Sequence, residues 1–469
     1  MKLLFIVENY PPHFGGVEVV FQNTCEGLAA RGHKVTVVTH QLRSSPAREK
    51  KNGVNIIRVP CLESRYLFTF LAPFRAFWQA KKADVVHTTT YNGAPPAWLV
   101  AKLWRKPVVI TVHETWIGHW QTYTNMSGWK AGLHDMLERP IFWLPFDQYL
   151  AVSESTRKQL LGVLDKSFRE RIMVNHNGFD YAHWSPDRHK ARAQQIRKEL
   201  GLHNEFVILA YGRPGYSKGF EYLLKAFPLV LRRWTGKQKP RLVLILSRDK
   251  AYEKEYEKLM DLLGPCEGQV TVLDPIGYSK LPPYLVMADC IVVPSLCEGF
   301  GYTTVEANAS ETPVVASGVA SIPEVISGKH VLVRPRSPKG IAEGILAVKA
   351  RKYKNTRQKK FLWKSNLERV ETVYADLLEE RKKIRALREK KRKAFLAKIN
   401  PENIFASIKK SWEKHAQKLQ EHKKNLQQKV KKAKARKEKA KKVKKAKTLQ
   451  GQKTKTPKKK TTKRKGKSR

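Results

Sequence analysis

Residues 290–310, CIVVPSLCEGFGYTTVEANAS, contain the most informative pattern of the chain. It begins with a short apolar, β-branched run typical of a buried strand, and it ends in a segment with helical composition. Residues 299–301, Gly-Phe-Gly, predict a strand–helix turn whose backbone N–H groups are exposed at a helix N-terminus. Glu298 precedes the turn and Glu306 follows it in the helix, so both carboxylates can face one crevice.

Similar apolar runs recur in two series on either side of residues 177–190, and helix-length amphipathic segments separate them. The stretch 177–190 lacks periodicity and is interpreted as an interdomain linker. Strand–helix alternation in two blocks predicts an α/β protein with two doubly wound, Rossmann-like domains, whose ligands bind beyond the carboxyl ends of parallel strands. The predicted strands are 3–7, 34–39, 84–88, 107–112 and 148–152, then 206–212, 241–246, 269–273, 290–294, 313–317 and 330–335.

The chain is expected to have four parts. Residues 1–180 form the first domain and residues 181–350 the second. Beyond 350 the strand pattern stops, and FLWKSNLERVETVYADLL has a helical apolar period, which predicts a helix within residues 351–380. Residues 381–469 form a Lys-rich tail that is expected to be helical to disordered.

Positive charge is concentrated at the C-terminal end. The whole chain has a formal net charge of +50, and residues 351–469 hold 46 Lys and Arg against 10 Asp and Glu. From 429 to 469 there are 22 basic residues and one acid, Glu438. Such a segment cannot build a core and should be disordered on its own.

The cysteines and the N-terminus indicate a cytoplasmic protein. The five cysteines are scattered and form no Cys-x-x-Cys pair, which argues against a disulfide framework or a zinc site. MKLLFIVENYPP is too short for a signal peptide and predicts a first strand. No window reaches about 18 uninterrupted apolar residues, so no transmembrane helix is expected.

Two loops at strand ends suit phosphate groups. Gly15 and Gly16 follow the first strand and open a helix, where exposed N–H groups favour an anion; a tight turn would explain them equally well. Arg213 and Lys218 stand in a glycine-containing loop after strand 206–212. Two cations at this end of a sheet suit a diphosphate, and ordinary surface charge is the alternative.

His113 and the two glutamates are the other candidates. His113 ends the apolar strand 107–112, where a ligand crevice is expected, although a lone histidine is more often structural. Glu298 and Glu306 are spaced for hydroxyl recognition, because carboxylates accept paired hydrogen bonds from vicinal diols. The alternative for Glu306 is a solvated charge on a helix.

In combination these motifs resemble the retaining glycosyltransferases of family 4, which have the GT-B fold. PSLCEGFGYTTVEA resembles the family's glutamate–seven residues–glutamate motif, and GRPGYSKG resembles its diphosphate loop. FGGVE, NGFD and IPEVI resemble its N-terminal glycine loop, interdomain signature and late turn. The helix around Trp363–Tyr374 resembles the last helix, which crosses back onto the first domain. The match covers about residues 1–378.

The resemblance implies a role for each candidate. Glu306 binds the ribose of a nucleotide-sugar donor and Glu298 holds the transferred sugar with the 299–301 backbone. His113 contacts the sugar from the first domain. Two cations neutralise the diphosphate, so no metal or other cofactor is expected. The implied catalytic residues are Glu298, His113, Arg213 and Lys218, and the implied donor-binding residues are Gly15, Gly16, Arg213, Lys218, Glu298, Gly299, Phe300, Gly301 and Glu306.

The sequence departs from the family pattern at three places. Ala320-Ser321 stands where Gly-Gly often precedes Ile-Pro-Glu, Pro214 directly follows the phosphate arginine, and His176 replaces a common proline. These departures bear on donor geometry.

Other functions stay open. A GT-B relative could catalyse phosphorolysis or sugar-nucleotide epimerisation, and the polycationic tail could bind nucleic acid, although it contains no recognisable binding module. The sugar, the base and the acceptor are not specified. Acceptor choice is expected in first-domain loops such as 115–140, rich in Trp and Tyr, and the acceptor could be lipid-linked, polysaccharide or protein.

The tail also suggests membrane attachment. In residues 400–419, Asn400 is the expected N-cap of a helix with an apolar stripe flanked by lysines. Such a pattern suits an anionic membrane surface, so residues 400–469 predict peripheral attachment to the inner face of the cell membrane. Packing on a partner or on the first domain is the alternative for the helix, and RNA is the alternative for the lysine run.

Overall fold

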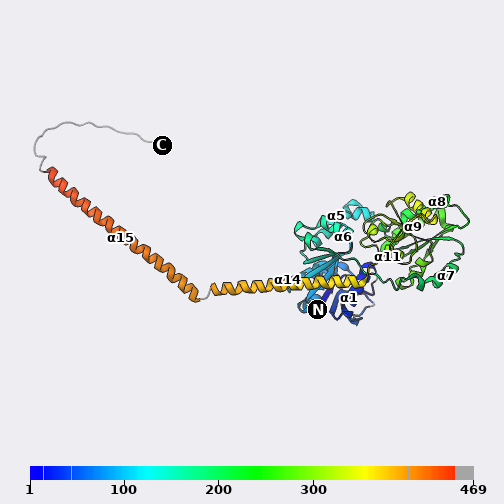
Figure 1. Ribbon diagram of the computed structural model, residues 1–469, viewed down its shortest axis with the longest axis horizontal. Helices are drawn as coiled ribbons and strands as arrows, with labels where there is room; N and C mark the ends of the chain where they lie inside the picture. The colour runs from blue at the N-terminus through cyan, green and yellow to red at the C-terminus, as the bar shows by residue number, and fades with distance from the viewer. Residues whose placement is uncertain (14, 44, 399–400, 449–469) are drawn as a thin grey trace, which may run out of the picture. The chain divides into compact units, whose positions relative to one another are not determined.

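The computed structural model describes residues 1–13, 15–43, 45–398 and 401–448. The chain divides into two compact units, Met1–Arg381 and Lys382–Arg469. The first unit contains two α/β domains, each built on its own sheet (Figure 1). Two doubly wound, Rossmann-like domains are the architecture predicted from the sequence.

The first domain is built on an eight-stranded sheet in the order β3-β4-β2-β1-β5-β6-β7-β8. Every neighbouring pair is parallel except the edge pair β3 and β4. The carboxyl ends of its central strands therefore lie along one edge. The strands are β1 (Lys2–Ile6), β2 (Lys34–His40), β3 (Arg48–Lys51), β4 (Val54–Val59), β5 (Val85–Thr89), β6 (Val108–Val112), β7 (Gln148–Ala151) and β8 (Ile172–Val174).

Helices cover both faces of this sheet. One hydrophobic cluster joins the sheet to α1 (Gly16–Ala30) and to the start of α14 (Trp363–Lys398). A second cluster joins the opposite face to four other helices. These are α2 (Arg65–Lys82), α3 (Ala94–Leu103), α5 (Gly128–Trp143) and α6 (Glu154–Val163).

The second domain has a seven-stranded sheet in the order β11-β10-β9-β12-β13-β14-β15, antiparallel only at β14–β15. Its strands are β9 (Phe206–Gly212), β10 (Pro240–Leu246), β11 (Val270–Leu273), β12 (Cys290–Val293), β13 (Val314–Ser317), β14 (Gly328–Val333) and β15 (Lys354–Thr356). Its helices are α7 (Lys190–Glu199), α8 (Phe220–Arg233), α9 (Glu253–Asp261), α10 (Pro282–Val286), α11 (Tyr302–Ala309), α12 (Ile322–Val325) and α13 (Pro338–Lys349).

All eleven runs predicted as strands are strands, and the unpredicted strands are β3, β4, β8 and β15. β3 and β15 are polar edge strands, REKK and KNT, without an apolar run. β4 contains a buried arginine, which interrupts its apolar run. The Arg58 side chain donates to Glu49 Oε1 at 2.5 Å and to the Pro11 carbonyl at 2.9 Å. A buried, paired arginine reads as a surface residue when only the sequence is considered.

The two segments that connect the domains lie side by side, one near residue 179 and the other near residue 361. The Phe179 N–H donates to the Phe361 carbonyl at 2.8 Å, and the Asn366 side chain donates to the His176 carbonyl at 2.8 Å. Beyond this crossing, α14 packs on the first domain, and Tyr374 forms a buried 2.5 Å hydrogen bond with His87 of β5. The return helix begins at Trp363 and continues past 380 to Lys398.

The second unit contains the end of α14 and the helix α15 (Pro401–Thr448). Residues 429–448 are helical, whereas the sequence predicted disorder from 429 onward. Lys and Ala, which dominate this stretch, have high helix propensity and need no core to form a helix. The predicted N-cap Asn400 and the end of the lysine run, residues 449–469, lie outside the described residues. None of the described helices has the length and apolar character needed to span a membrane.

Candidate active site

Glu298 lies in the loop that leads from β12 to α11. Its Oε1 accepts hydrogen bonds from Lys218 Nζ at 2.7 Å and from Ser295 Oγ at 2.8 Å. The Lys218 side chain is 26% exposed and that of Glu298 is 10% exposed, so the ion pair is partly shielded from water. The structure therefore brings together an acid and a cation that the sequence placed in separate motifs.

Glu306 lies in α11 and its side chain is buried. Tyr211, on β9, donates its hydroxyl to Glu306 Oε2 at 2.7 Å. Burial raises the pKa of Glu306 to about 7, and the Tyr211 hydrogen bond and the charge of Lys218 act against that rise. Glu306 is thus part of a buried polar cluster, in contrast to the solvated helix charge considered as the alternative.

The turn at residues 299–301, between the two glutamates, contacts the first domain. The Gly299 carbonyl accepts a hydrogen bond from Ser153 Oγ at 2.6 Å. A Cβ atom on Gly299 would lie 2.1 Å from the His113 carbonyl oxygen, so only glycine fits there. The Phe300 side chain is buried in the second-domain core, which leaves only its backbone for a ligand. The turn therefore brings the end of β6 close to Glu298.

His113 follows β6 directly, and its Nε2 is buried with no hydrogen-bond partner among the described residues. Burial lowers its pKa to about 4, although the nearby carboxylate of Glu18 acts in the opposite direction. His113 is therefore a neutral imidazole at physiological pH. A buried ring nitrogen without a partner can bind a ligand hydroxyl.

Glu114 is a site residue that the sequence reasoning missed. Burial and the charge of Glu298 raise the pKa of Glu114 to about 7. Cys297, which precedes Glu298, lies with its Sγ 3.9 Å from Glu114 Oε2. The signal for Glu114 in the sequence is its position next to His113 at the end of a strand.

Arg213 is exposed. Burial acts to raise the pKa of Glu18 in the first domain, but the hydrogen bond with His13 and, more weakly, the charge of Arg213 hold that pKa below its usual value. The carboxylate of Glu18 lies against Gly15 and forms a 2.9 Å ion pair with His13. The start of α1, where Gly15 and Gly16 were predicted to border phosphates, thus holds a carboxylate that the sequence reasoning overlooked. The neighbouring Phe14 of the FGGVE motif lies outside the described residues.

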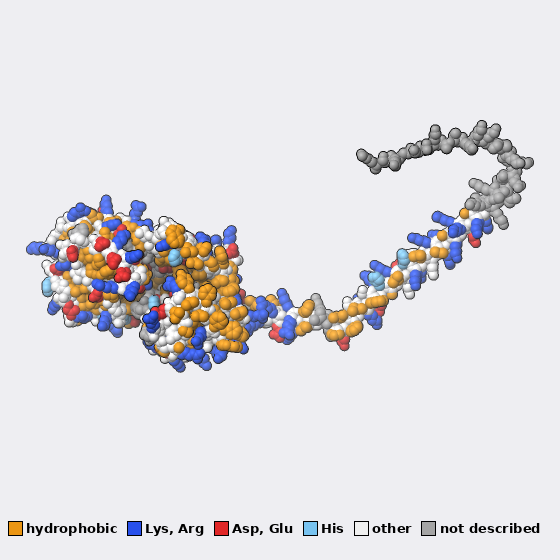
Figure 2. Space-filling view, turned by 180° about the vertical axis from the view of Figure 1, so that it is seen from behind, with side chains coloured by type: hydrophobic (Ala, Val, Ile, Leu, Met, Phe, Trp, Pro, Cys, Tyr) orange, Lys and Arg blue, Asp and Glu red, His pale blue; other side chains and the backbone are white. Residues whose placement is uncertain are grey.

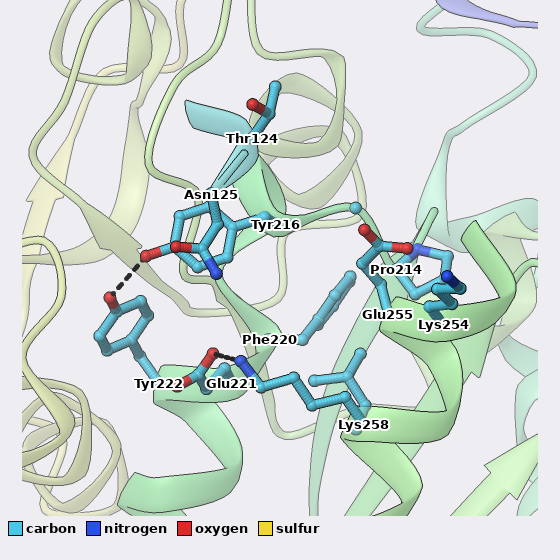
Figure 3. Close-up of a pocket in the computed structure, with 12 residues that line it drawn as sticks. Thr124, Asn125, Pro214, Tyr216, Phe220, Glu221, Tyr222, Lys254, Glu255 and Lys258 are labelled. Carbon is cyan, nitrogen blue, oxygen red and sulfur yellow. Dashed lines mark hydrogen bonds and ion pairs between the residues drawn. The ribbon is translucent and has the colours of Figure 1, made fainter. Parts of the chain in front are cut away.

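A pocket of about 180 Å³ is lined in part by Pro214, Gly215 and Tyr216 of the predicted diphosphate loop (Figure 3). In this pocket Tyr216 and Tyr222 point toward one another, and Lys258 pairs with Glu221 at 2.9 Å. The pocket does not reach either predicted glutamate. The lining residues are Thr124, Asn125, Pro214, Gly215, Tyr216, Phe220, Glu221, Tyr222, Lys254, Glu255, Lys258 and Leu259.

Residues that depart from the family pattern, Ala320-Ser321 and His176, are accommodated by local backbone conformation and hydrogen bonds. Ala320 adopts the left-handed conformation with φ of 46°, which explains why glycine suits that position. The following Ser321 donates to the Glu298 carbonyl at 2.9 Å. His176 forms a 2.5 Å pair with Glu324, which also accepts from the Glu154 N–H at 2.9 Å. Glu324 therefore links the second domain to the N-terminus of α6.

Residues 115–140, expected to be loops, are mostly helical. They form α4 (Trp120–Thr124) and much of α5. Trp120 donates its indole N–H to the buried Glu138 at 2.8 Å. Arg336 of the second domain donates to the Thr122 carbonyl at 2.7 Å, so this segment is part of the interdomain contact.

Comparison with known proteins identifies the family. The model described as "Glycosyl transferase 4-like domain" matches residues 15–178, and that described as "Glycosyl transferases group 1" matches residues 192–366. An uncharacterized glycosyltransferase of Methanocaldococcus jannaschii is 30% identical over 372 residues, 74% of this chain and 88% of that relative. A D-inositol 3-phosphate glycosyltransferase of Corynebacterium glutamicum is 28% identical over 351 residues, 71% of this chain and 82% of the relative.

Two solved structures share the fold. HepE of Anabaena, in complex with UDP and glucose, has a TM-score of 0.59 and 16% identity and covers 80% of this chain and 100% of its own. Sucrose-phosphate synthase of Thermosynechococcus elongatus has a TM-score of 0.61 and 21% identity and covers 84% of this chain and 99% of its own. By its family models, its archaeal relative and its two-domain fold, the chain belongs to the family 4-type glycosyltransferases with the GT-B fold.

Proposed function

We propose that this glycosyltransferase moves a sugar from a nucleotide diphosphate-sugar to an acceptor hydroxyl with retention of the anomeric configuration. The observation that carries the proposal is the position of Lys218. Its ammonium group pairs with Glu298 and its charge also acts on Glu306. A cation between two hydroxyl-binding acids suits a ligand with a diphosphate between a sugar and a ribose.

In the proposed complex the second domain holds most of the donor. Glu306 accepts hydrogen bonds from the ribose hydroxyls, and Glu298 accepts them from the transferred sugar together with the backbone at 299–301. The unpaired Nε2 of His113 contacts the sugar from the first domain. Because His113 is neutral, its ring can serve as a hydrogen-bond donor or acceptor without placing a second charge beside the sugar.

Retention follows if the acceptor attacks from the face that the diphosphate leaves. The bond between the anomeric carbon and the diphosphate oxygen breaks, and a bond to the acceptor oxygen forms. The acceptor proton passes to the departing diphosphate oxygen. Arg213 and Lys218 stabilise the charge that develops on the diphosphate, which is why we propose a reaction without a metal.

We further propose that the acceptor is lipid-linked or part of a cell-envelope glycan and that the tail attaches the enzyme to the membrane. On α15, exposed apolar side chains accompany many lysines. An anionic lipid surface suits both features. The relatives act on various acceptors by name, including D-inositol 3-phosphate in one and glycogen in another.

A donor screen tests the proposal. Thermal unfolding is measured with UDP-, GDP-, ADP- and dTDP-sugars, and a ligand at about 100 times its dissociation constant should stabilise the fold by about 2.7 kcal/mol. The anomeric configuration of the product is then read by NMR, with and without EDTA. An inverted product contradicts retention, and loss of activity in EDTA contradicts the metal-free reaction. Turnover without any acceptor indicates phosphorolysis or epimerisation.

A further inference from the structure

Helix α2 exposes a stripe of large aromatic side chains. Its buried face is mostly alanine, with Phe68, Ala72, Ala76 and Ala80 packed into the first-domain core. The outward stripe at i, i+4 spacing is aromatic, and its members are Tyr66, Phe70, Phe74 and Trp78, which are 59%, 72%, 78% and 60% exposed. Large apolar side chains normally face the core. Core packing therefore does not account for this stripe.

Two neighbouring helices continue the apolar surface. Helices α2, α3 and α5 all pack into the same core cluster, so they cover the same face of the first sheet. Figure 2 shows hydrophobic side chains gathered over a broad area of this domain. We call this surface the α2–α3–α5 face. In addition to the α2 stripe, its exposed members are Leu99 and Leu103 on α3, and Trp129, Leu133, Met136, Leu137 and Trp143 on α5.

The charge around this face is positive. Helices α2 and α3 contain no acidic residue, and on α5 the carboxylate of Glu138 is buried while Asp135 accepts from a backbone N–H and lies near Arg139. The basic residues Arg75, Lys82 and Lys130 are exposed and form no ion pair within the described part of the chain. The face thus combines exposed aromatic rings with unpaired cations.

We propose that the α2–α3–α5 face docks on the surface of an anionic lipid bilayer. Aromatic rings with a polar edge or neighbour suit the boundary between headgroups and acyl chains, and unpaired Lys and Arg suit anionic headgroups. A second copy of the face would bring like charges together, and so would the lysine-rich helix α15. Charge complementarity therefore selects the bilayer as the occupant.

The docking surface is connected to the site by α5. From this helix, buried Glu138 accepts from Trp120 in the segment that contacts the second domain, while Trp129 and Met136 point to solvent. Docking along α5 would bring the interdomain contact close to the bilayer. This last step rests on the proposed function, since it serves a lipid-linked acceptor, whereas the docking itself does not depend on glycosyl transfer.

The test uses the full-length protein and vesicle flotation without substrate. One set of vesicles contains equal parts of phosphatidylglycerol and phosphatidylcholine, and the other contains phosphatidylcholine alone. The variant Phe70→Ser/Phe74→Ser/Trp78→Ser should lower the partition coefficient on anionic vesicles about tenfold or more, because bound apolar area is lost at constant charge. Leu332→Ser, an exposed leucine of the second domain, is the matched control and should bind as the wild type does.

Two further variants secure the interpretation. Trp129→Ser/Met136→Ser/Trp143→Ser tests α5 and provides an independent measurement if the α2 variant fails to fold. Ile408→Ser/Trp412→Ser tests the tail, and the proposal requires that vesicle binding still depends on α2 in this background. Unchanged partition of both first-domain variants overturns the proposal. It is equally overturned if those variants dissociate a dimer in sedimentation experiments and leave vesicle binding intact.

Discussion

The two sides of the interdomain contact differ in whether their polar side chains have hydrogen-bond partners within the protein. On the second-domain side Glu298 is paired with Lys218, and Glu306 accepts from a buried tyrosine. On the first-domain side His113 Nε2 has no partner among the described residues, and partial burial together with the charge of Glu298 raises the pKa of Glu114. The acids of the second-domain side are thus held by partners within their own domain, whereas the first-domain side retains a ring nitrogen that has no partner among the described residues.

The strongest test of this comparison is Arg213→Ala. Arg213 is the exposed cation of the predicted diphosphate loop, and the proposed mechanism assigns it the charge on the leaving group. Turnover should fall by about two to three orders of magnitude, as the loss of one preorganised charge partner can cause. Steady-state kinetics with saturating donor measures the effect. Arg232→Ala, on α8, is a control that should keep near-normal rates, and a similar loss in both variants would assign the effect to general charge.

The second-domain side could be predicted because its motif is contiguous. Strand, turn and helix follow within residues 290–310, so the spacing of Glu298 and Glu306 carries most of the geometry. The first-domain side depends on contacts between distant segments. The surroundings of Glu18 and Glu114 depend on segments that are distant in the sequence. The same holds for the pairing of Lys218 with Glu298, which lie in separate loops.

The sequence also did not predict which side chains of helix α2 are exposed to solvent. Helix α2 carries apolar residues on both its buried and its exposed face, so periodicity gave no indication that its aromatic stripe would be exposed. The central strands of both sheets were predictable from their apolar runs, because they are buried on both faces. The polar edge strands β3 and β15 were not predictable, since pairing to one neighbour requires no apolar pattern.

Glu114→Gln tests the first-domain side through the pH dependence of stability. The folded protein raises the pKa of Glu114 from 4.5 to about 7, so folding favours its protonated form. This contribution to stability is fully present below pH 4.5 and is lost as the pH rises through 7. Glutamine lacks it, so the free energy of unfolding of the variant relative to wild type should increase by about 3 kcal/mol between pH 4.5 and pH 8.

Urea denaturation at both pH values measures this difference. Glu257→Gln removes an exposed carboxylate on α9 and should show no such trend. If the difference in the free energy of unfolding between Glu114→Gln and wild type does not depend on pH, the carboxyl group of Glu114 is solvated in the folded protein. The contrast between the two sides would then rest on His113 alone.

The division of labour between the two glutamates is tested by binding alone. Glu306→Gln should weaken binding of the nucleoside diphosphate about 10- to 150-fold, because a hydrogen bond to a charged group contributes about 1.5–3 kcal/mol. Glu298→Gln should leave this affinity unchanged or improve it, since it frees Lys218 from its ion pair. Isothermal titration calorimetry with the nucleoside diphosphate decides, and equal weakening by both variants would contradict the assignment.

Glu324 of the second domain accepts hydrogen bonds from the first domain, and its removal should have a modest effect. Burial acts to raise its pKa, but the hydrogen bonds from His176 and from the Glu154 and Ser155 N–H groups hold the pKa below its usual value. The carboxylate therefore stabilises the N-terminus of α6 across the interface. Removing its charge with Glu324→Gln should cost about 0.5–1 kcal/mol, which corresponds to a rise in donor KM of about 2- to 5-fold.

The matched control for this contact is Glu154→Gln. Glu154 lies at the same helix N-terminus, but its side chain is 53% exposed and faces Arg157 within α6. Both substitutions remove one negative charge near α6, and only Glu324→Gln removes a charge that spans the domains. A larger KM effect for Glu324→Gln, reduced at high salt, indicates that the contact holds the two sides in the donor-binding arrangement. Equal effects would show that α6 responds to net charge alone, and the two sides would then be held together by α14 and the Gly299 contact.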